Sequence, residues 1–128
     1  MKVITLKQPW ATLVAEGIKE YEFRSWKYNY RGEILIHAGG SEDKEAMERV
    51  KPLNLSYPKM QIIAKVTIDD CIKLDSNISK KINQTNKLIY GEKVREGYAW
   101  KLSNATKIDL DKKIPGKQGI WNYELDEL

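Results

Sequence analysis

The chain has 128 residues, 41% hydrophobic and 31% charged, which is ordinary for a folded protein that buries its own core. Its net charge of +4 permits contacts with phosphates but lacks the dense basic stripe of a dedicated nucleic-acid-binding protein. One cysteine excludes an internal disulfide framework, and no apolar run is long enough to span a bilayer. Because no signal-peptide pattern is present either, we expect a cytoplasmic protein without membrane contact.

A short strand and a helix are predicted first. Residues 2–6 alternate weakly, as in a strand, and Pro9 stands where the first residue of a helix is often proline. Gly17 is typical of the residue that ends such a helix. The apolar face of this helix is formed, at helical spacing, by Trp10, Leu13, Val14 and Ile18.

Two more strands follow the first helix. Residues 21–26 alternate, so that Glu22, Arg24 and Trp26 share one face and aromatic side chains share the other. After a turn, residues 32–40 have the apolar run of a second strand. The sequence therefore predicts that two charged side chains point the same way from one strand.

The middle of the chain predicts a helix and a long strand. Ser41 is a good N-cap for a short helix that Pro52 ends. Residues 60–74 alternate clearly, but the run is long for one strand, so we expect a bend or bulge near Asp69 and Asp70.

The last third predicts a polar connection and two strands. Residues 75–97 indicate a loop with a short helix over 78–89, and strands follow at 98–102 and 121–125. Strands and helices do not alternate regularly, which argues against a doubly wound parallel sheet. We expect an α+β fold in one domain over residues 1–128: a small mixed β-barrel of about six strands, with two or three short helices packed outside.

Unusual residues gather between residues 8 and 37 and suggest a binding cleft. Glu22 and Arg24 lie about 6.5–7 Å apart along one strand, and Lys19 stands just past the helix. Arg24 can donate a planar fork to a phosphate or a base edge, and an indole can stack a base for about 1–3 kcal/mol. The candidate ligand-binding residues are Trp10, Lys19, Glu22, Arg24, Trp26, Arg31, His37 and Trp100.

Each candidate also has a purely structural interpretation. Lys19 can complement the C-terminal dipole of the helix, and Glu22 and Arg24 can form a structural ion pair. His37 is more typical of a hydrogen-bonded interior residue than of a catalyst. Among the tryptophans, Trp26 lies next to charges and is the best stacking candidate, because the others fall on core-like positions.

The stretches QPWATLVAEGIKEYEFRSW and YRGEILIHAGG resemble the signature of the ASCH family, the activating signal cointegrator homology domains. The likeness includes the QPWA opening, the GxKxxExR core, the YRG turn and the IHA strand end, and it covers most of the chain. This resemblance implies a PUA-like β-barrel with a cleft between the first helix and the barrel. Lys19, Glu22 and Arg24 would line that cleft, and RNA or another nucleic acid would be the partner.

We therefore interpret the chain as an ASCH domain that binds nucleic acid, RNA foremost, or a nucleotide. The partner would be RNA, another single-stranded nucleic acid or a nucleoside or nucleotide. We expect no cofactor, and no metal, because His37 and Cys71 are the only imidazole and thiol available. A protein-interaction module would instead show an exposed apolar patch, and the sequence has the opposite bias.

The alternative is a metal-free amidohydrolase that deacylates N4-acetylcytidine or a related base, as some small bacterial members of the family do. Lys19 would act as the base, Glu22 would relay the proton and Arg24 would steady the oxyanion. Two features count against this reading. The members that hydrolyse acetylcytidine carry a threonine where this chain has Glu22. The reaction also needs a second acid, for which Asp70 is the candidate we name.

Overall fold

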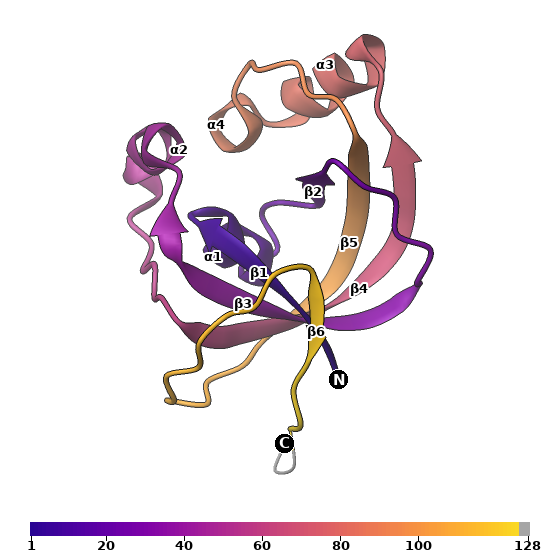
Figure 1. The fold of residues 1–128 in the computed structure, drawn as a ribbon. Helices are drawn as coiled ribbons and strands as arrows, with labels where there is room; N and C mark the ends of the chain where they lie inside the picture. Colours follow the sequence, from indigo (N-terminus) through magenta and orange to yellow (C-terminus); the bar gives the residue numbers. More distant parts are fainter. Residues whose placement is uncertain (126–128) are drawn as a thin grey trace.

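The framework of the protein is a six-stranded sheet with the strand order β2-β5-β4-β3-β1-β6 (Figure 1). The computed structural model describes residues 1–125. The strands are β1 (Lys2–Gln8), β2 (Tyr21–Arg24), β3 (Gly32–Glu42), β4 (Gln61–Lys73), β5 (Tyr98–Lys107) and β6 (Ile120–Asn122). The helices are α1 (Trp10–Ala15), α2 (Lys44–Arg49), α3 (Ser76–Thr85) and α4 (Lys87–Tyr90), with a 3-10 turn at Lys51–Leu53.

The sheet is mixed, as the sequence predicts, and strongly curled. β1 and β3 run parallel, whereas every other neighbouring pair is antiparallel. The edge strands β2 and β6 do not pair with each other, so the sheet stays open. The term barrel therefore describes the curvature of this sheet and not a closed ladder.

The expected bulge lies in β4. The register between β4 and β5 shifts between Ile68 and Asp70, where Asp70 interrupts the apolar alternation. On either side of this shift β4 stays paired, with β3 up to Ile68 and with β5 as far as Lys73. One strand can therefore bend around the core and take part in both halves of the curl.

The helix after β3 begins later than expected. Ser41 belongs to β3, which continues to Glu42 because that residue is paired with Gln8 of β1. Asp43 is the N-cap of α2 instead, and its carboxylate accepts a hydrogen bond of 3.1 Å from the backbone N–H of Ala46. The prediction that Ser41 caps this helix is wrong, because strand pairing continues past it.

The main core lies between α1 and the curled sheet. Five of the six residues of α1 are buried, and Ala11, Val14 and Ala15 pack against apolar side chains from β1, β3, β4 and β5. A second apolar cluster, which includes Trp121, covers the other face of β3. β3 is therefore buried on both faces, which explains its unbroken apolar run.

Candidate ligand-binding cleft

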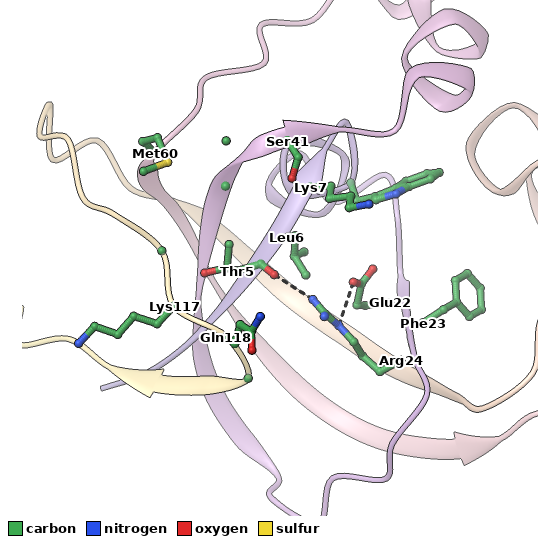
Figure 2. A pocket seen from close by; sticks show the side chains of 15 residues that line it. Thr5, Leu6, Lys7, Glu22, Phe23, Arg24, Ser41, Met60, Lys117 and Gln118 are labelled. Atoms are coloured by element: carbon green, nitrogen blue, oxygen red, sulfur yellow. Dashed lines mark hydrogen bonds and ion pairs between the residues drawn. The ribbon is translucent and has the colours of Figure 1, made fainter.

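A cleft of about 850 Å³ opens beside β1 and β2 (Figure 2). Its walls come from the end of β1, the start of α1, β2, the end of β3 and the loop before β6. The polar and aromatic side chains that line it are Thr5, Lys7, Trp10, Glu22, Phe23, Arg24, Ser41, Lys117 and Gln118. Segments that are distant in sequence therefore meet at one concave surface.

β2 supplies two of the charged residues of the cleft wall, Glu22 and Arg24. It pairs with β5 in an antiparallel register that fixes Glu22 opposite Trp100 and Arg24 opposite Tyr98. Arg24 Nε lies 3.4 Å from Glu22 Oε2, and Arg24 Nη2 donates a 2.9 Å hydrogen bond to the Thr5 carbonyl. The guanidinium is thus held between its own strand and β1, at the surface of the cleft.

Lys19 lies behind this wall. Its ammonium donates to the other oxygen of Glu22 at 2.9 Å and to the carbonyl of Tyr21, and only 3% of the residue is exposed. Burial lowers the pKa of Lys19, while the negative charge of Glu22 acts in the opposite direction. Three aromatic rings lie 5.1–5.9 Å from the ammonium, those of Trp10, Phe23 and Tyr90.

Comparison with known proteins decides the family. The model of the ASCH domain matches residues 4–111, which is most of the chain. The chain belongs to the ASCH family. Activating signal cointegrator 1 of Mus musculus is 37% identical over 54 residues, or 42% of this chain, and the match spans 9% of that relative's length.

Two solved structures have the same fold as this ASCH domain. Both are crystal structures of mutant forms of the ZmASCH protein of Zymomonas mobilis, at 16% sequence identity. They match with TM-scores of 0.54 and 0.55, over 97% of this chain and 88% and 90% of theirs. At this level of identity the likeness supports the fold alone.

Five of the predicted site residues of this ASCH domain do not line the cleft. Lys19 is one of them, because its ammonium is buried behind Glu22. Trp100 is 1% exposed and forms part of the main core. Trp26 packs edge-on against it, with ring centroids 4.9 Å apart. Arg31 donates to the carbonyls of Tyr28 and Tyr30, so it holds the turn before β3, and His37 is fully buried. The tryptophan that lines the cleft is Trp10, although its position on the apolar face of the predicted helix is more typical of the core than that of Trp26.

His37 supports the cleft from behind through a chain of hydrogen bonds. The indole N–H of Trp121 donates to the hydroxyl of Thr5 at 3.1 Å, which leaves that hydroxyl to donate to His37 Nδ1 at 3.2 Å. His37 Nε2 then carries the proton and donates to the Ile114 carbonyl at 2.6 Å. Burial lowers the pKa of His37. A neutral imidazole therefore anchors the segment that leads into the loop at Gly116, which lines the cleft.

Positive charge dominates the lining of this ASCH domain's cleft. Lys7, Arg24 and Lys117 are its cations and Glu22 its carboxylate, and both oxygens of that carboxylate already face cations. Sequence reasoning missed the two lysines, because they approach β2 only through the fold. Asp70, the candidate second acid, is exposed and lies 3.6 Å from Arg31, away from the cleft.

Within residues 1–125, no group of three or more His, Cys, Asp or Glu side chains is arranged to hold a metal ion. None of the helices over the same residues has the length and apolar character needed to cross a membrane.

Proposed function

We propose that this ASCH domain binds single-stranded RNA and takes one nucleotide into the cleft. ASCH domains are associated with RNA binding. The observation that carries the proposal is the position of Arg24, a guanidinium held at the surface of a concave site that also contains an indole. The cleft volume of about 850 Å³ lies in the range of small-molecule sites, which suits one nucleotide better than a duplex.

Each lining group has a role that follows from its contacts. Among the described contacts, Arg24 Nη1 makes no hydrogen bond, so it can donate to a phosphate or a base edge. Trp10 can stack the base, as aromatic side chains do in single-stranded RNA complexes. Lys7 and Lys117 are exposed at the rim, where they can neutralise neighbouring phosphates. Glu22 positions Arg24 and does not contact the ligand, because one of its carboxylate oxygens faces Lys19 and the other faces Arg24.

A binding titration with a fluorescent RNA pentanucleotide at several salt concentrations tests the proposal. We expect binding at low salt that weakens as salt rises, and a loss of about tenfold or more for Arg24→Gln. Lys27→Gln is the matched control, because it removes the same charge from an exposed side chain near β2 that does not line the cleft. Absence of binding at low salt, or equal losses for both variants, would contradict the proposal.

The second candidate is deacylation of N4-acetylcytidine. The observation in its favour is a buried lysine with a lowered pKa, hydrogen-bonded to a carboxylate of the cleft wall, since such a lysine is suited to act as a base. The lining offers Glu22 as its carboxylate, and this residue is occupied by Lys19 and Arg24. Incubating the pure protein with N4-acetylcytidine and measuring cytidine decides the question: turnover that Lys19→Met abolishes supports it, and no turnover at high protein concentration rejects it.

A further inference from the structure

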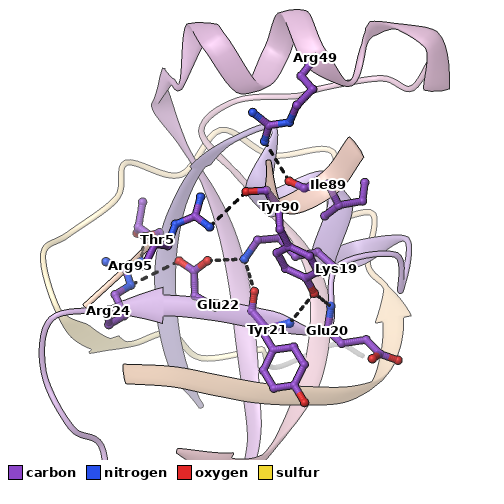
Figure 3. A network of polar contacts seen from close by, with 10 residues as sticks. All are labelled: Thr5, Lys19, Glu20, Tyr21, Glu22, Arg24, Arg49, Ile89, Tyr90 and Arg95. Carbon is purple, nitrogen blue, oxygen red and sulfur yellow. Dashed lines mark hydrogen bonds and ion pairs between the residues drawn. The ribbon is translucent and has the colours of Figure 1, made fainter. Parts of the chain in front are cut away.

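Two arginines from distant parts of the chain meet above Lys19 (Figure 3). Arg49 is the last residue of α2, and Arg95 lies between α4 and β5. Arg49 donates from Nε and Nη2 to the carbonyls of Leu88 and Ile89, at 2.8 and 3.0 Å. Arg95 Nη1 donates to the next carbonyl, that of Tyr90, at 3.2 Å. The last three carbonyls of α4 therefore hold both guanidinium groups side by side.

The pair lies against the aromatic wall of the cleft. Arg95 Cζ is 4.5 Å from the centroid of the Phe23 ring, and Arg49 Cζ is 6.0 Å from the centroid of the Trp10 ring. Both rings line the cleft. A ligand seated between Arg24 and these rings would therefore have the two arginines next to it.

The protein itself neutralises this pair poorly. The nearest carboxylate to Arg49 is that of Glu45, at 3.8 Å and with 91% of its side chain exposed, so it contributes little. Among residues 1–125, no carboxylate lies within 4.0 Å of the Arg95 guanidinium. Burial lowers the pKa of Arg95 and the charge of Arg49 lowers it further, while the carboxylates of Glu22 and Asp43, which lie beyond 4.0 Å, act in the opposite direction. Two adjoining and partly buried cations without a close carboxylate are unfavourable unless an anion joins them.

We propose that Arg49 and Arg95 form a phosphate-binding subsite beside the cleft. Each guanidinium has five N–H donors, and the α4 carbonyls take two from Arg49 and one from Arg95, so donors remain for phosphate oxygens. The identity of the ligand rests on the proposed function: the phosphate belongs to the nucleotide that enters the cleft. The subsite makes the protein selective for phosphorylated ligands over free nucleosides.

Calorimetric titrations with cytidine and with cytidine 5′-monophosphate test the subsite. We expect the wild-type protein to bind the monophosphate about tenfold or more tightly than the nucleoside. In the Arg49→Gln/Arg95→Gln variant this ratio falls towards one, while the affinity for cytidine stays unchanged. The matched control is Lys80→Gln/Lys81→Gln, which removes two charges from exposed positions of α3 and keeps the wild-type ratio. A ratio near one in the wild type, or an equal fall in the control, overturns the subsite.

A second measurement does not depend on the variants folding, which the loss of bonds to α4 could impair. In the wild-type protein, inorganic phosphate should shift the Nε–H NMR signals of Arg49 and Arg95 in a saturable way, and leave that of Arg31 unmoved. Unmoved signals from Arg49 and Arg95 overturn the subsite. An RNA pentanucleotide that displaces the bound phosphate identifies nucleic acid as the source of the group, and phosphate that stays bound identifies the free ion.

The titrations and the NMR measurement can reject the phosphate subsite and the proposed function of the cleft independently of each other. If cytidine and its monophosphate bind equally well, the cleft stands and the subsite is rejected. If neither binds but inorganic phosphate shifts both arginine signals, the subsite stands and the proposed function fails.

Discussion

Arg24 donates a 2.9 Å hydrogen bond to the backbone carbonyl of Thr5, and this contact joins strands that no ladder connects. β2 is one edge of the open sheet, and β1 lies next to the opposite edge. The curl is therefore bridged at this point by a side chain that also lines the cleft. A ligand that takes hydrogen bonds from Arg24 acts directly on the contact that sets the distance between the two walls.

Glu22→Gln should destabilise the fold by about 3 kcal/mol, because it leaves the buried ammonium of Lys19 without an anion. Burial already lowers the pKa of Lys19, so the folded state gives up this proton more readily than the unfolded state. The loss should therefore shrink as the pH rises towards the ordinary lysine value of 10.5. Urea unfolding of the wild type and of Glu22→Gln at several pH values measures this loss of stability.

The variant Lys19→Met/Glu22→Gln is the control for this experiment, since it removes both charges and should recover most of the lost stability. A Glu22→Gln protein as stable as the wild type would show that the carboxylate does not compensate a buried charge.

Trp10 and Trp26 should have opposite roles. Trp10→Leu should weaken RNA binding by about 1–3 kcal/mol, because Trp10 lines the cleft and leucine cannot stack a base. Trp26→Ala should cost about 1–3 kcal/mol of stability and leave the affinity unchanged, because its ring packs on Trp100. Thermal melting and RNA titration of both variants check this, and a loss of affinity in Trp26→Ala with Trp10→Leu unaffected would reverse the assignment.

Stability should fall as the pH drops below about 6.5, in part because of His37. Burial lowers the pKa of this imidazole, against the bond to the Ile114 carbonyl that favours protonation. The unfolded chain therefore takes up a proton at His37 at a higher pH than the folded chain does, which favours unfolding. Melting temperatures between about pH 7.5 and pH 5 should fall less steeply for His37→Gln than for the wild type. Parallel slopes would assign the acid sensitivity to other groups.

Gly97→Ala should destabilise the protein by about 3 kcal/mol and weaken RNA binding as well. Gly97 has a φ of 91°, and a Cβ there would lie 2.5 Å from the backbone carbonyl oxygen of Arg24. The added methyl group therefore displaces the strand that carries the cleft arginine. Gly17→Ala is the matched control, since Gly17 also has a positive φ of 74° but no heavy atom within 4 Å of its Cβ. Equal losses of stability in both variants would mean that the positive φ alone, and not the clash with Arg24, causes the destabilisation.

The sequence predicts the strands well where alternation is strong. β4 and its bulge follow from one polar residue, Asp70, at an apolar position, and the common face of Glu22 and Arg24 follows from their spacing in β2. The position of Lys19 behind the wall could not be predicted. It depends on Tyr90 of α4, a helix that is distant in sequence. The hydroxyl of Tyr90 accepts hydrogen bonds from the backbone N–H groups of residues 20 and 21.

Local patterns also fail where tertiary contacts decide between two options. Trp26 lies beside charged residues in the sequence, but the turn after β2 directs its ring onto Trp100. Arg49 and Arg95 belong to a short helix and a connecting segment with no shared motif, so only the carbonyls of α4 bring them together. Such pairings depend on loop geometry, which periodicity does not encode.

The parallel pairing of β1 and β3 has a consequence for how this cleft can diversify. Since both strands run in the same direction, the chain leaves them at the same rim, where Lys7 and Ser41 line the site. Insertions or substitutions just beyond either strand would reshape the rim while the buried scaffold beneath stays intact. Exchanging these two short exit segments would thus change the shape and charge of the cleft without disturbing the fold.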